Sequence, residues 1–443
     1  MPAARNALEL RHELLERLAE ARSRTDELFE VVEPEFLYER PIPERHRIIF
    51  YLGHLEAFDW NLLRERLLGR EAFHPEFDRL FAFGIDPVGG GLPSDQPSDW
   101  PSLDQVRAYQ RRIRETLDEG VEKVLSATSS DQHPSATQLL NVAIEHRLMH
   151  AETFTYMLHQ MPLDRKRRNP HLAPAPAVQV RPTMVEIPEG SATLGLSRTA
   201  DRFGWDNEYE SHVVEVPAFT IDQYKVTNGQ FLEFMDAGGY ERRDLWTEAD
   251  WNWKQERNIS FPSFWRRTDD RWFLATMFNN LPLPLDWPVY VSQAEASAYA
   301  RWAGKSLPSE AQWHRAAYGT PKGFERPYPW GTQLPNPKLG NFDFQNWDPV
   351  SVTAFPEHQS GFGVADLLGN GWEWTSTLFG PFPGFERFPF YPGYSADFFD
   401  GKHYVMKGGS PRTAACMLRR SFRNWFQPHY PYVYAGFRCV GNP

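Results

Sequence analysis

The chain has 443 residues, of which 41% are hydrophobic, and a formal net charge of −11. This length predicts two or three domains. The acidic balance, without a sustained basic stripe, argues against nucleic acid or an anionic membrane as a partner, and the presence of only two cysteines, Cys416 and Cys439, argues against a disulfide framework or a cysteine-based zinc site. No apolar run approaches the ~18 residues of a membrane-spanning helix, and the charged N-terminus lacks the apolar segment of a signal peptide, so we expect cytoplasmic residence.

The N-terminal part has apolar residues at helical spacing. This pattern predicts four helices, over residues 7–30, 45–68, 103–127 and 135–160, with Ser135 as the N-cap of the last. Four helices of this length predict a bundle, which we place at residues 1–165. Residues 73–102 are rich in Gly, Pro and Asp and are expected to form one long loop between the second and third helices.

The composition changes after the bundle. Residues 166–182 are basic and then rich in Pro and Ala, as expected of a linker, and residues 183–443 form the second predicted domain. In that domain short β-prone runs alternate with turn residues, which predicts strands within 184–190, 192–197, 212–222, 404–410 and 435–440 and helices within 227–238 and 292–304.

Histidines in the fourth predicted helix could ligate a metal ion. Because each helical residue advances by ~100°, His146 and His150 lie on one face, whereas Glu152 points elsewhere and His159 is expected to be exposed. A third ligand should therefore come from another helix. His54, beside an apolar stripe of the second predicted helix, is the leading candidate, since bundles build metal sites from facing helices.

Spacing alone leaves ordinary structural roles open for these residues. A histidine beside an apolar stripe is often a core residue, and a histidine pair on a helix is often non-metallic. Glu152 is either an acceptor for the N–H of a ligand histidine or a surface carboxylate.

The C-terminal part carries a series of collinear motifs. In chain order these are MVEIPEGSATLGL, YKVTNGQFLEF, WPVYVSQAEASAYARWAGKSLPSEAQWHRAAYG, YPWGTQLPNPKLGNFDF, GVADLLGNGWEWTST, VMKGGSPR and AGFRCV. Together they resemble the formylglycine-generating-enzyme-like (sulfatase-modifying-factor) fold, which implies a mixed α+β, C-type-lectin-like domain. Cys416 and Cys439 do not reproduce the active-site cysteine pair of those enzymes, so the domain looks repurposed. Trp372, Glu373 and Trp374 are shared with the whole class and are expected to hold the fold.

The combination of the two predicted domains is informative. A DinB-like four-helix bundle with an H-x3-H-x-E motif, fused to this α+β domain, resembles the sulfoxide synthases of ergothioneine and ovothiol biosynthesis (the EgtB family) and the related selenoneine synthase (SenA). The resemblance implies an oxidoreductase in which His54, His146 and His150 hold non-heme Fe(II). It implies O2 as co-substrate and oxidative coupling of a thiol or selenol to the imidazole C2 of hercynine.

The same resemblance assigns residues of the second domain. Family members place a proton-donating tyrosine, and a second tyrosine that contacts hercynine, in the loop after the GNxWEW motif. Tyr391 and Tyr394 have the matching spacing, although two aromatic residues that only pack in this loop would show the same pattern. Asn424 and Trp425 match the Asn-Trp pair that contacts hercynine, and an aromatic face attracts a desolvated trimethylammonium group by ~1–2 kcal/mol.

Other positions depart from the family pattern and bear on the donor. Members that use γ-glutamylcysteine carry Asp and Arg where this chain has Phe426 and Tyr430, and the Tyr-Tyr pair of cysteine-using members is also missing. Met149 lies among the changed residues between the two histidines, where the family has Gln, and is expected to contact substrate. A pocket lined by aromatics and hydroxyls suits a sugar, so we favour the selenoneine synthase branch with a selenosugar donor.

Three alternatives stay open. The first is an ergothioneine-type sulfoxide synthase that uses cysteine, γ-glutamylcysteine or another thiol. The second is a thiol transferase that uses a divalent metal without redox chemistry, since DinB-type bundles with three histidines also occur there. The third is a carbohydrate-binding or scaffold protein without a catalytic metal.

Overall fold

The computed structural model describes residues 7–85, 92–127, 134–167 and 180–442. The chain divides into two compact units, residues 1–169 and residues 170–443. Among the described residues, no helix combines the length and apolar character needed to cross a membrane.

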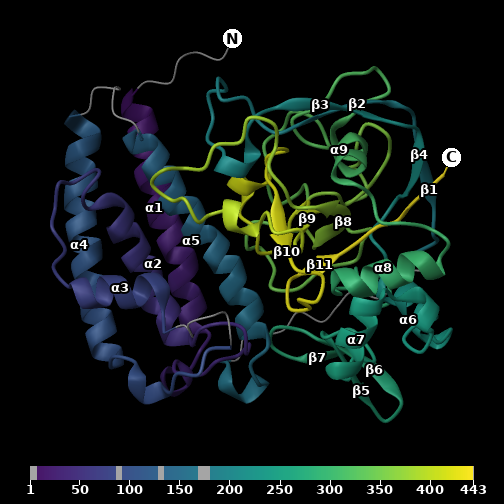
Figure 1. Cartoon of the computed structure of the whole chain (residues 1–443), viewed down its shortest axis with the longest axis horizontal. Helices are drawn as coiled ribbons and strands as arrows, with labels where there is room; N and C mark the ends of the chain where they lie inside the picture. The colour runs from purple at the N-terminus through teal and green to yellow at the C-terminus, as the bar shows by residue number, and fades with distance from the viewer. Residues whose placement is uncertain (1–6, 86–91, 128–133, 168–179, 443) are drawn as a thin grey trace. The chain divides into compact units, whose positions relative to one another are not determined.

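The N-terminal unit is helical (Figure 1), and its helices are α1 (Ala7–Glu30), α2 (Ile48–Leu63), α3 (Pro75–Phe83), α4 (Leu103–Ala127) and α5 (Ala136–His159). Helix α1 packs against α5, and α2 packs against α3, α4 and α5. The four predicted helices are confirmed. Ser135 caps α5 as expected, because its hydroxyl accepts a hydrogen bond from the Gln138 N–H at 3.1 Å.

Helix α3 corrects the prediction of a single long loop over residues 73–102. Pro75 stands in its first turn, where a missing N–H costs nothing, and Gly84 ends it with φ +72°. Its buried side presents Phe77 and Phe81, four residues apart, to the bundle. The Phe81 ring packs directly against the α2 backbone at Gly53, where a Cβ atom would lie 2.3 Å from the ring.

The C-terminal unit is an α+β domain of short strands joined by long irregular segments, as expected. Its helices are α6 (Asn228–Asp236), α7 (Glu248–Glu256), α8 (Gln293–Trp302) and α9 (Glu310–Tyr318). Its strands are β1 (Met184–Ile187), β2 (Gly190–Leu194), β3 (His212–Val216), β4 (Phe219–Asp222), β5 (Trp265–Thr268), β6 (Arg271–Ala275), β7 (Asn280–Pro282), β8 (Trp372–Leu378), β9 (Tyr404–Lys407), β10 (Asn424–Phe426), β11 (Ala435–Gly436) and β12 (Val440–Gly441).

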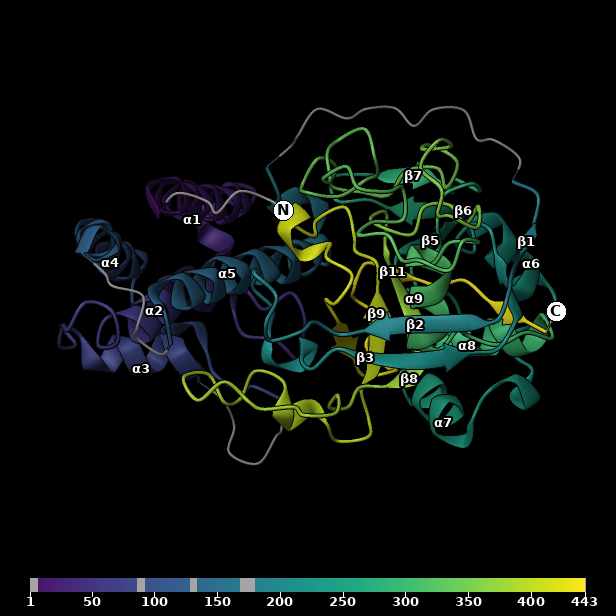
Figure 2. The same cartoon turned by 90° about the horizontal axis from the view of Figure 1, so that it is seen from above.

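The strands form four small sheets, ordered β1-β4-β12, β10-β9-β8-β11, β2-β3 and β5-β6-β7. Figure 2 shows the β2-β3 pair as a ribbon, in which Gly190 faces Val216 and Leu194 faces His212. All pairs are antiparallel except β11 with β8. The predicted run 212–222 is two strands, because proline at 217 interrupts it, and the prediction missed α7, α9 and the strands β5 to β8 and β10.

The GNGWEWT segment lies at the centre of this unit, on β8. Glu373 is fully buried, and its carboxylate accepts hydrogen bonds from Arg438 at 2.6 and 2.8 Å and from the Trp313 indole at 2.9 Å, with Lys225 at 3.2 Å. These contacts tie β8 to α9 and to the C-terminal strand segment. The interpretation of this motif as fold-holding agrees with them.

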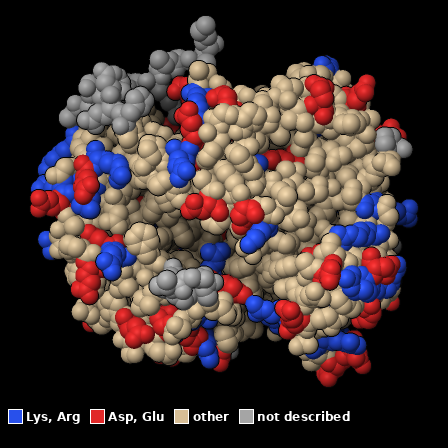
Figure 3. All heavy atoms as spheres, viewed as in Figure 1, with Lys and Arg blue, Asp and Glu red and all other residues tan. Residues whose placement is uncertain are grey.

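The face shown in Figure 3 carries acidic and basic side chains interspersed across uncharged surface. Cys416 and Cys439 form no disulfide in the described part of the chain, and Cys439 is fully buried. Burial raises the pKa of the Cys439 thiol well above its ordinary value, so this residue is a poor nucleophile.

Candidate metal centre

Three histidines from two helices converge inside the helical unit. Each offers a ring nitrogen, and these atoms lie within 4.8 Å of one another; His54 Nε2 and His150 Nε2 are 3.2 Å apart. The ring centroids are separated by 5.4 Å for His54 and His146, 4.8 Å for His54 and His150, and 4.5 Å for His146 and His150. A metal–imidazole bond of about 2.1 Å gives ligand spacings of about 3 to 4.2 Å. The cluster therefore fits one ion after at most a slight contraction of its widest pair.

Burial keeps these imidazoles neutral. It lowers the pKa of His54 to about 4 and the pKa of both His146 and His150 well below the ordinary value, and the positive charge of Arg147 acts in the same direction. The neutral ring is the form that donates a lone pair to a metal. At neutral pH the cluster therefore presents three uncharged nitrogen donors.

A backbone carbonyl at the end of α3 orients one of the rings. His54 Nδ1 lies 2.7 Å from Phe81 O, so the Nδ1–H donates to this carbonyl and Nε2 carries the lone pair. A hydrogen bond of this kind fixes the tautomer and orientation of a ligating histidine. Sequence reasoning missed this group, although proline in the first turn, Phe77 and Phe81 four residues apart and Gly84 together signal a short helix.

Aromatic rings on α2 pack against the histidines. Phe58 stacks on His146 with ring centroids 3.4 Å apart and an interplanar angle of 10°, and Phe50 stacks on His54 at 4.8 Å. Tyr51 lies 5.9 Å from His150. These contacts restrict the rotamers of the histidines and surround them with apolar surface, which strengthens metal–ligand electrostatics.

The structure also places the other predicted residues of α5. Glu152 is buried, which excludes the surface-carboxylate reading, and Met149 is half-buried. His159 is also buried, although we expected it to be exposed. The chain turns back after α5, with Lys166 Nζ donating to His159 O at 3.4 Å and Arg167 N donating to Val31 O at 2.8 Å, and this return covers the end of the helix.

In the α+β unit, the two predicted tyrosines and Trp425 gather around Trp205. Tyr394 stacks on Trp205 at 3.9 Å and 23° and meets the edge of Trp425 at 5.5 Å. Tyr391 lies 5.7 Å from Tyr394 and 6.3 Å from Trp205, between ring centroids. The structure therefore brings three predicted residues of this unit into one aromatic cluster.

A buried carboxylate accompanies this cluster. Asp206 is fully buried and accepts a hydrogen bond from the Ser395 hydroxyl at 2.6 Å, and burial raises its pKa. Burial, together with the negative charge of Asp206, raises the pKa of Tyr391 to about 12, so the phenol keeps its proton at neutral pH. Sequence reasoning missed Trp205 and Asp206 because their segment, FGWDNEYES, has no periodic pattern.

The predicted Asn-Trp pair lies on the edge strand β10. Asn424 Oδ1 accepts a hydrogen bond from Trp425 N at 2.8 Å, and the Trp425 ring stacks on Phe379 at 4.1 Å and 5°. Phe426 follows on the same strand and stacks on Tyr430 at 5.2 Å and 13°. All four predicted residues of this segment are half-buried, so part of each side chain reaches solvent.

Comparison with known proteins agrees with this division. Residues 17–154 match the model of the DinB superfamily, and residues 170–443 match that of the sulfatase-modifying factor enzyme 1-like domain. The chain is thus a helical DinB domain followed by an α+β domain related to formylglycine-generating enzymes.

Two relatives align along nearly the whole chain. A hercynine oxygenase of Mycolicibacterium smegmatis is 35% identical over 97% of this chain and 99% of its own length, and a hercynine oxygenase of Mycolicibacterium thermoresistibile is 32% identical over 97% and 95%. A formylglycine-generating enzyme of Mycobacterium tuberculosis is 32% identical, but over only 45% of this chain and 75% of its own. The chain belongs to the hercynine oxygenase (EgtB) family, and it is an enzyme of the non-heme iron oxidoreductase class.

Proposed function

We propose that this enzyme joins a sulfur donor to the imidazole C2 of hercynine in an O2-dependent reaction, with Fe(II) bound by His54, His146 and His150. The observation that carries the proposal is the convergence of three neutral imidazoles, one buried and the others at most partly exposed, in a chain that aligns along nearly its whole length with hercynine oxygenases. In sulfoxide formation the C2–H and S–H bonds break and the C2–S bond forms. One oxygen atom of O2 goes to sulfur and the other leaves as water.

The histidine cluster fits the group that the family implies. Imidazole nitrogen is a suitable ligand for iron, and three neutral donors leave further coordination positions for substrates. When bound, ferrous iron supplies a redox centre at which the donor chalcogen and O2 can react side by side. The chain contributes the His54 orientation through Phe81 O and the apolar packing of Phe50 and Phe58 around the rings.

The aromatic cluster supplies two roles in this proposal. Trp425 and Tyr394 meet edge to face, and their ring faces attract the trimethylammonium group of hercynine. Tyr391 is the proton donor in this proposal, and its phenol keeps its proton at neutral pH. Asn424 and Met149 complete the proposed substrate contacts.

A second candidate donor is favoured by a specific contact. Phe426 and Tyr430 stack on each other where γ-glutamylcysteine-using enzymes place an acid and a base, so this pair offers no charges to a zwitterion. Aromatic faces and a hydroxyl suit a sugar ring, which supports selenoneine synthesis from a selenosugar as the alternative reaction. The relatives support the sulfur reaction.

The test is anaerobic loading with Fe(II), followed by O2 and hercynine with each of cysteine, γ-glutamylcysteine, a thiosugar and a selenosugar. O2 consumption and product mass are the measurements. We expect coupling to hercynine in the wild type and in the matched control His12→Ala, an exposed histidine of α1, and none in His146→Ala. Product formation without O2 would instead indicate a thiol transferase, and O2 uptake equal in His146→Ala and wild type would contradict the proposal.

The same assay separates the donors. A selenosugar that reacts more than tenfold faster than every thiol has a transition-state advantage of ~1.4 kcal/mol and establishes the selenium reaction. A tenfold advantage of cysteine or γ-glutamylcysteine establishes the sulfur reaction.

A further inference from the structure

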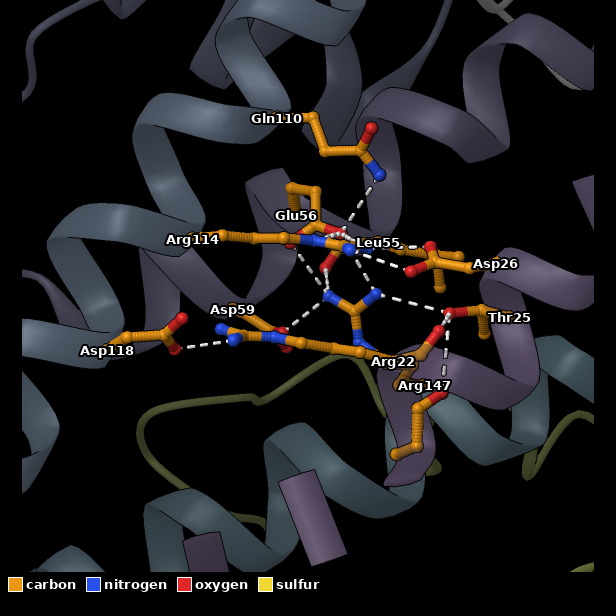
Figure 4. A network of polar contacts seen from close by, with 11 residues as sticks. Arg22, Thr25, Asp26, Leu55, Glu56, Asp59, Gln110, Arg114, Asp118 and Arg147 are labelled. Carbon is orange, nitrogen blue, oxygen red and sulfur yellow. Dashed lines mark hydrogen bonds and ion pairs between the residues drawn. The ribbon is translucent and has the colours of Figure 1, made fainter. Parts of the chain in front are cut away.

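A buried cluster of charges lies next to the histidines in sequence, since Arg147 is one residue from His146 and Glu56 is two residues from His54. Arg147 follows His146 directly on α5, and its side chain is fully buried. Its Nη2 donates to Leu55 O at 2.9 Å, to Glu56 at 3.0 Å and to Asp59 at 2.6 Å, all on α2, and its Nη1 donates to Glu56 at 3.1 Å (Figure 4). One guanidinium therefore connects α5 to three residues of α2.

Further contacts extend this cluster to the remaining long helices. Arg114 on α4 contacts Glu56 at 2.6 and 2.9 Å and Asp26 on α1 at 2.7 and 2.8 Å. Arg147 Nη1 also lies 3.4 Å from the Thr25 hydroxyl of α1. The helices α1, α2, α4 and α5 thus meet at this cluster, as the convergence of side chains in Figure 4 shows.

The energetics of such a cluster do not explain its presence. Buried ion pairs cost desolvation that their attraction barely repays, and replacing all members with apolar residues is often neutral or stabilising. What the cluster offers is geometry, because a guanidinium is a rigid fork with fixed donor directions. The Arg147 guanidinium donates to the carbonyl of Leu55, the residue directly after His54. Arg147 itself directly follows His146.

We propose that Arg147, Glu56 and Asp59 are positioning residues that hold α2 and α5 in the register at which the three histidines share one ion. This inference rests on the proposed metal binding by those histidines. None of the three residues is placed in contact with the ion. They act through the helices, so their removal loosens the metal site more than it destabilises the fold.

The experiment compares metal binding with folding in the full-length protein. The main variant replaces the whole cluster with apolar side chains, Arg147→Met with Glu56→Leu and Asp59→Leu, which leaves no charge unpaired on α2 or α5. The matched control, Arg11→Met with Glu122→Ala, removes a 3.2 Å ion pair between α1 and α4. Anaerobic titration with Fe(II) and with Co(II) gives dissociation constants, the Co(II) visible spectrum reports the ligand geometry, and urea unfolding reports stability.

We expect the main variant to unfold at the wild-type urea concentration or higher, with its Fe(II) and Co(II) dissociation constants raised tenfold or more and its Co(II) spectrum altered. The control should keep the wild-type constants and spectrum. A folded main variant with wild-type constants and spectrum overturns the inference. Metal binding that is absent from the wild type itself would instead overturn the proposed function.

A second variant keeps the inference testable if the apolar replacement does not fold. Arg147→Lys retains the charge, but a single ammonium cannot reach Leu55 O, Glu56 and Asp59 along the three directions of the fork. We expect its dissociation constants to rise at least fivefold and its Co(II) spectrum to change. Wild-type values for both in folded Arg147→Lys overturn the inference.

Discussion

Two polar clusters lie side by side along helices α2 and α5, and they are built on opposite principles. In the arginine cluster, donors face acceptors: Arg147 meets Glu56 and Asp59 at 2.6 to 3.1 Å, and among the described residues its Nε is the one nitrogen of that side chain with no hydrogen-bond partner. In the histidine cluster, ring nitrogens face one another, with His54 Nε2 and His150 Nε2 3.2 Å apart. In the first arrangement opposite charges compensate one another, although Asp59 Oδ1 also has no hydrogen-bond partner among the described residues. The second arrangement is suited to a cation.

The protonation states follow the same division. Burial disfavours charge in both clusters, but the arginine cluster contains compensating opposite charges, so the pKa of Glu56 falls to about 2 although burial opposes this shift. For the histidines burial is the largest influence on the pKa, and it keeps the rings neutral. Buried polar groups that are hydrogen-bonded to one another stabilise the fold. Buried groups of the same kind that face one another, as the three imidazoles do, indicate a ligand site.

The largest expected effect is the loss of the metal from the histidine cluster. We expect His54→Ala to raise the dissociation constants for Fe(II) and Co(II) by more than about 100-fold. The loss of a residue that only orients a ligand costs up to about 100-fold, and the loss of a ligand should cost more. Calorimetric titration measures the constants, and circular dichroism at 222 nm checks that the helices persist. An effect below tenfold would mean that α2 contributes no ligand, and the comparison between the clusters would fail.

The second prediction concerns stability. Arg147→Met leaves Asp59 buried without its hydrogen-bonded counter-charge and leaves Glu56 with Arg114 alone, so we expect the free energy of unfolding to fall by about 3–5 kcal/mol. In the metal-free protein, His150→Leu replaces a buried neutral ring with an apolar side chain of similar size and should change stability by less than about 1.5 kcal/mol. Urea unfolding of both variants makes the measurement. Equal losses would show that the two clusters have the same structural role.

The third prediction uses pH. The folded-state pKa of Glu56 is about 2, below its ordinary value of 4.5, so the unfolded chain binds the proton first as pH falls. Its contribution to stability is therefore complete above about pH 4.5 and is lost as pH falls toward 2, by about 3 kcal/mol in all. Unfolding of wild type and Glu56→Gln between pH 5 and pH 2.5 should show a stability difference that shrinks with acid. The exposed control Glu119→Gln should show no such trend, and a constant difference for Glu56→Gln would contradict the assignment.

Much of the helical unit could be predicted from the sequence, because long amphipathic helices carry their own signal. The ranges 7–30 and 103–127 agree with α1 and α4 residue for residue. A four-residue spacing on α5 and an apolar stripe on α2 singled out the three histidines as candidates, and the family resemblance, rather than the spacing, implied that they share one ion. Helix α3 was missed because its nine residues give barely two turns of pattern inside a segment rich in loop-forming residues.

The remaining site features depend on contacts between distant parts of the chain. Arg147 and Glu56 are 91 residues apart, and nothing local distinguishes this arginine from a solvated one. Asp206 and Ser395 are 189 residues apart. In the α+β unit the strands are two to seven residues long, so the order of its motifs, rather than periodicity, predicted the fold.

The smallest predicted effect tests how the histidine cluster depends on its neighbour α3. Gly53 precedes His54, and alanine there would favour the helix by up to about 1 kcal/mol on propensity alone. Its Cβ, however, would lie 2.3 Å from the ring of Phe81, which is fully buried and cannot swing outward. Overpacking of this kind costs about 1–3 kcal/mol, so the clash outweighs the gain and α3 must shift.

That shift moves the Phe81 carbonyl away from its 2.7 Å contact with His54 Nδ1. We therefore expect Gly53→Ala to be destabilised by up to about 2 kcal/mol and to bind Co(II) about tenfold more weakly, the lower range for loss of an outer-shell group. Gly120→Ala on α4 is the matched control, because the atoms nearest its Cβ belong to the flexible end of Leu68 at 2.8 Å. It should gain stability and keep the wild-type constant. If Gly53→Ala binds Co(II) as tightly as this control, the carbonyl does not orient the ring, and the histidine cluster owes its geometry to α2 and α5 alone.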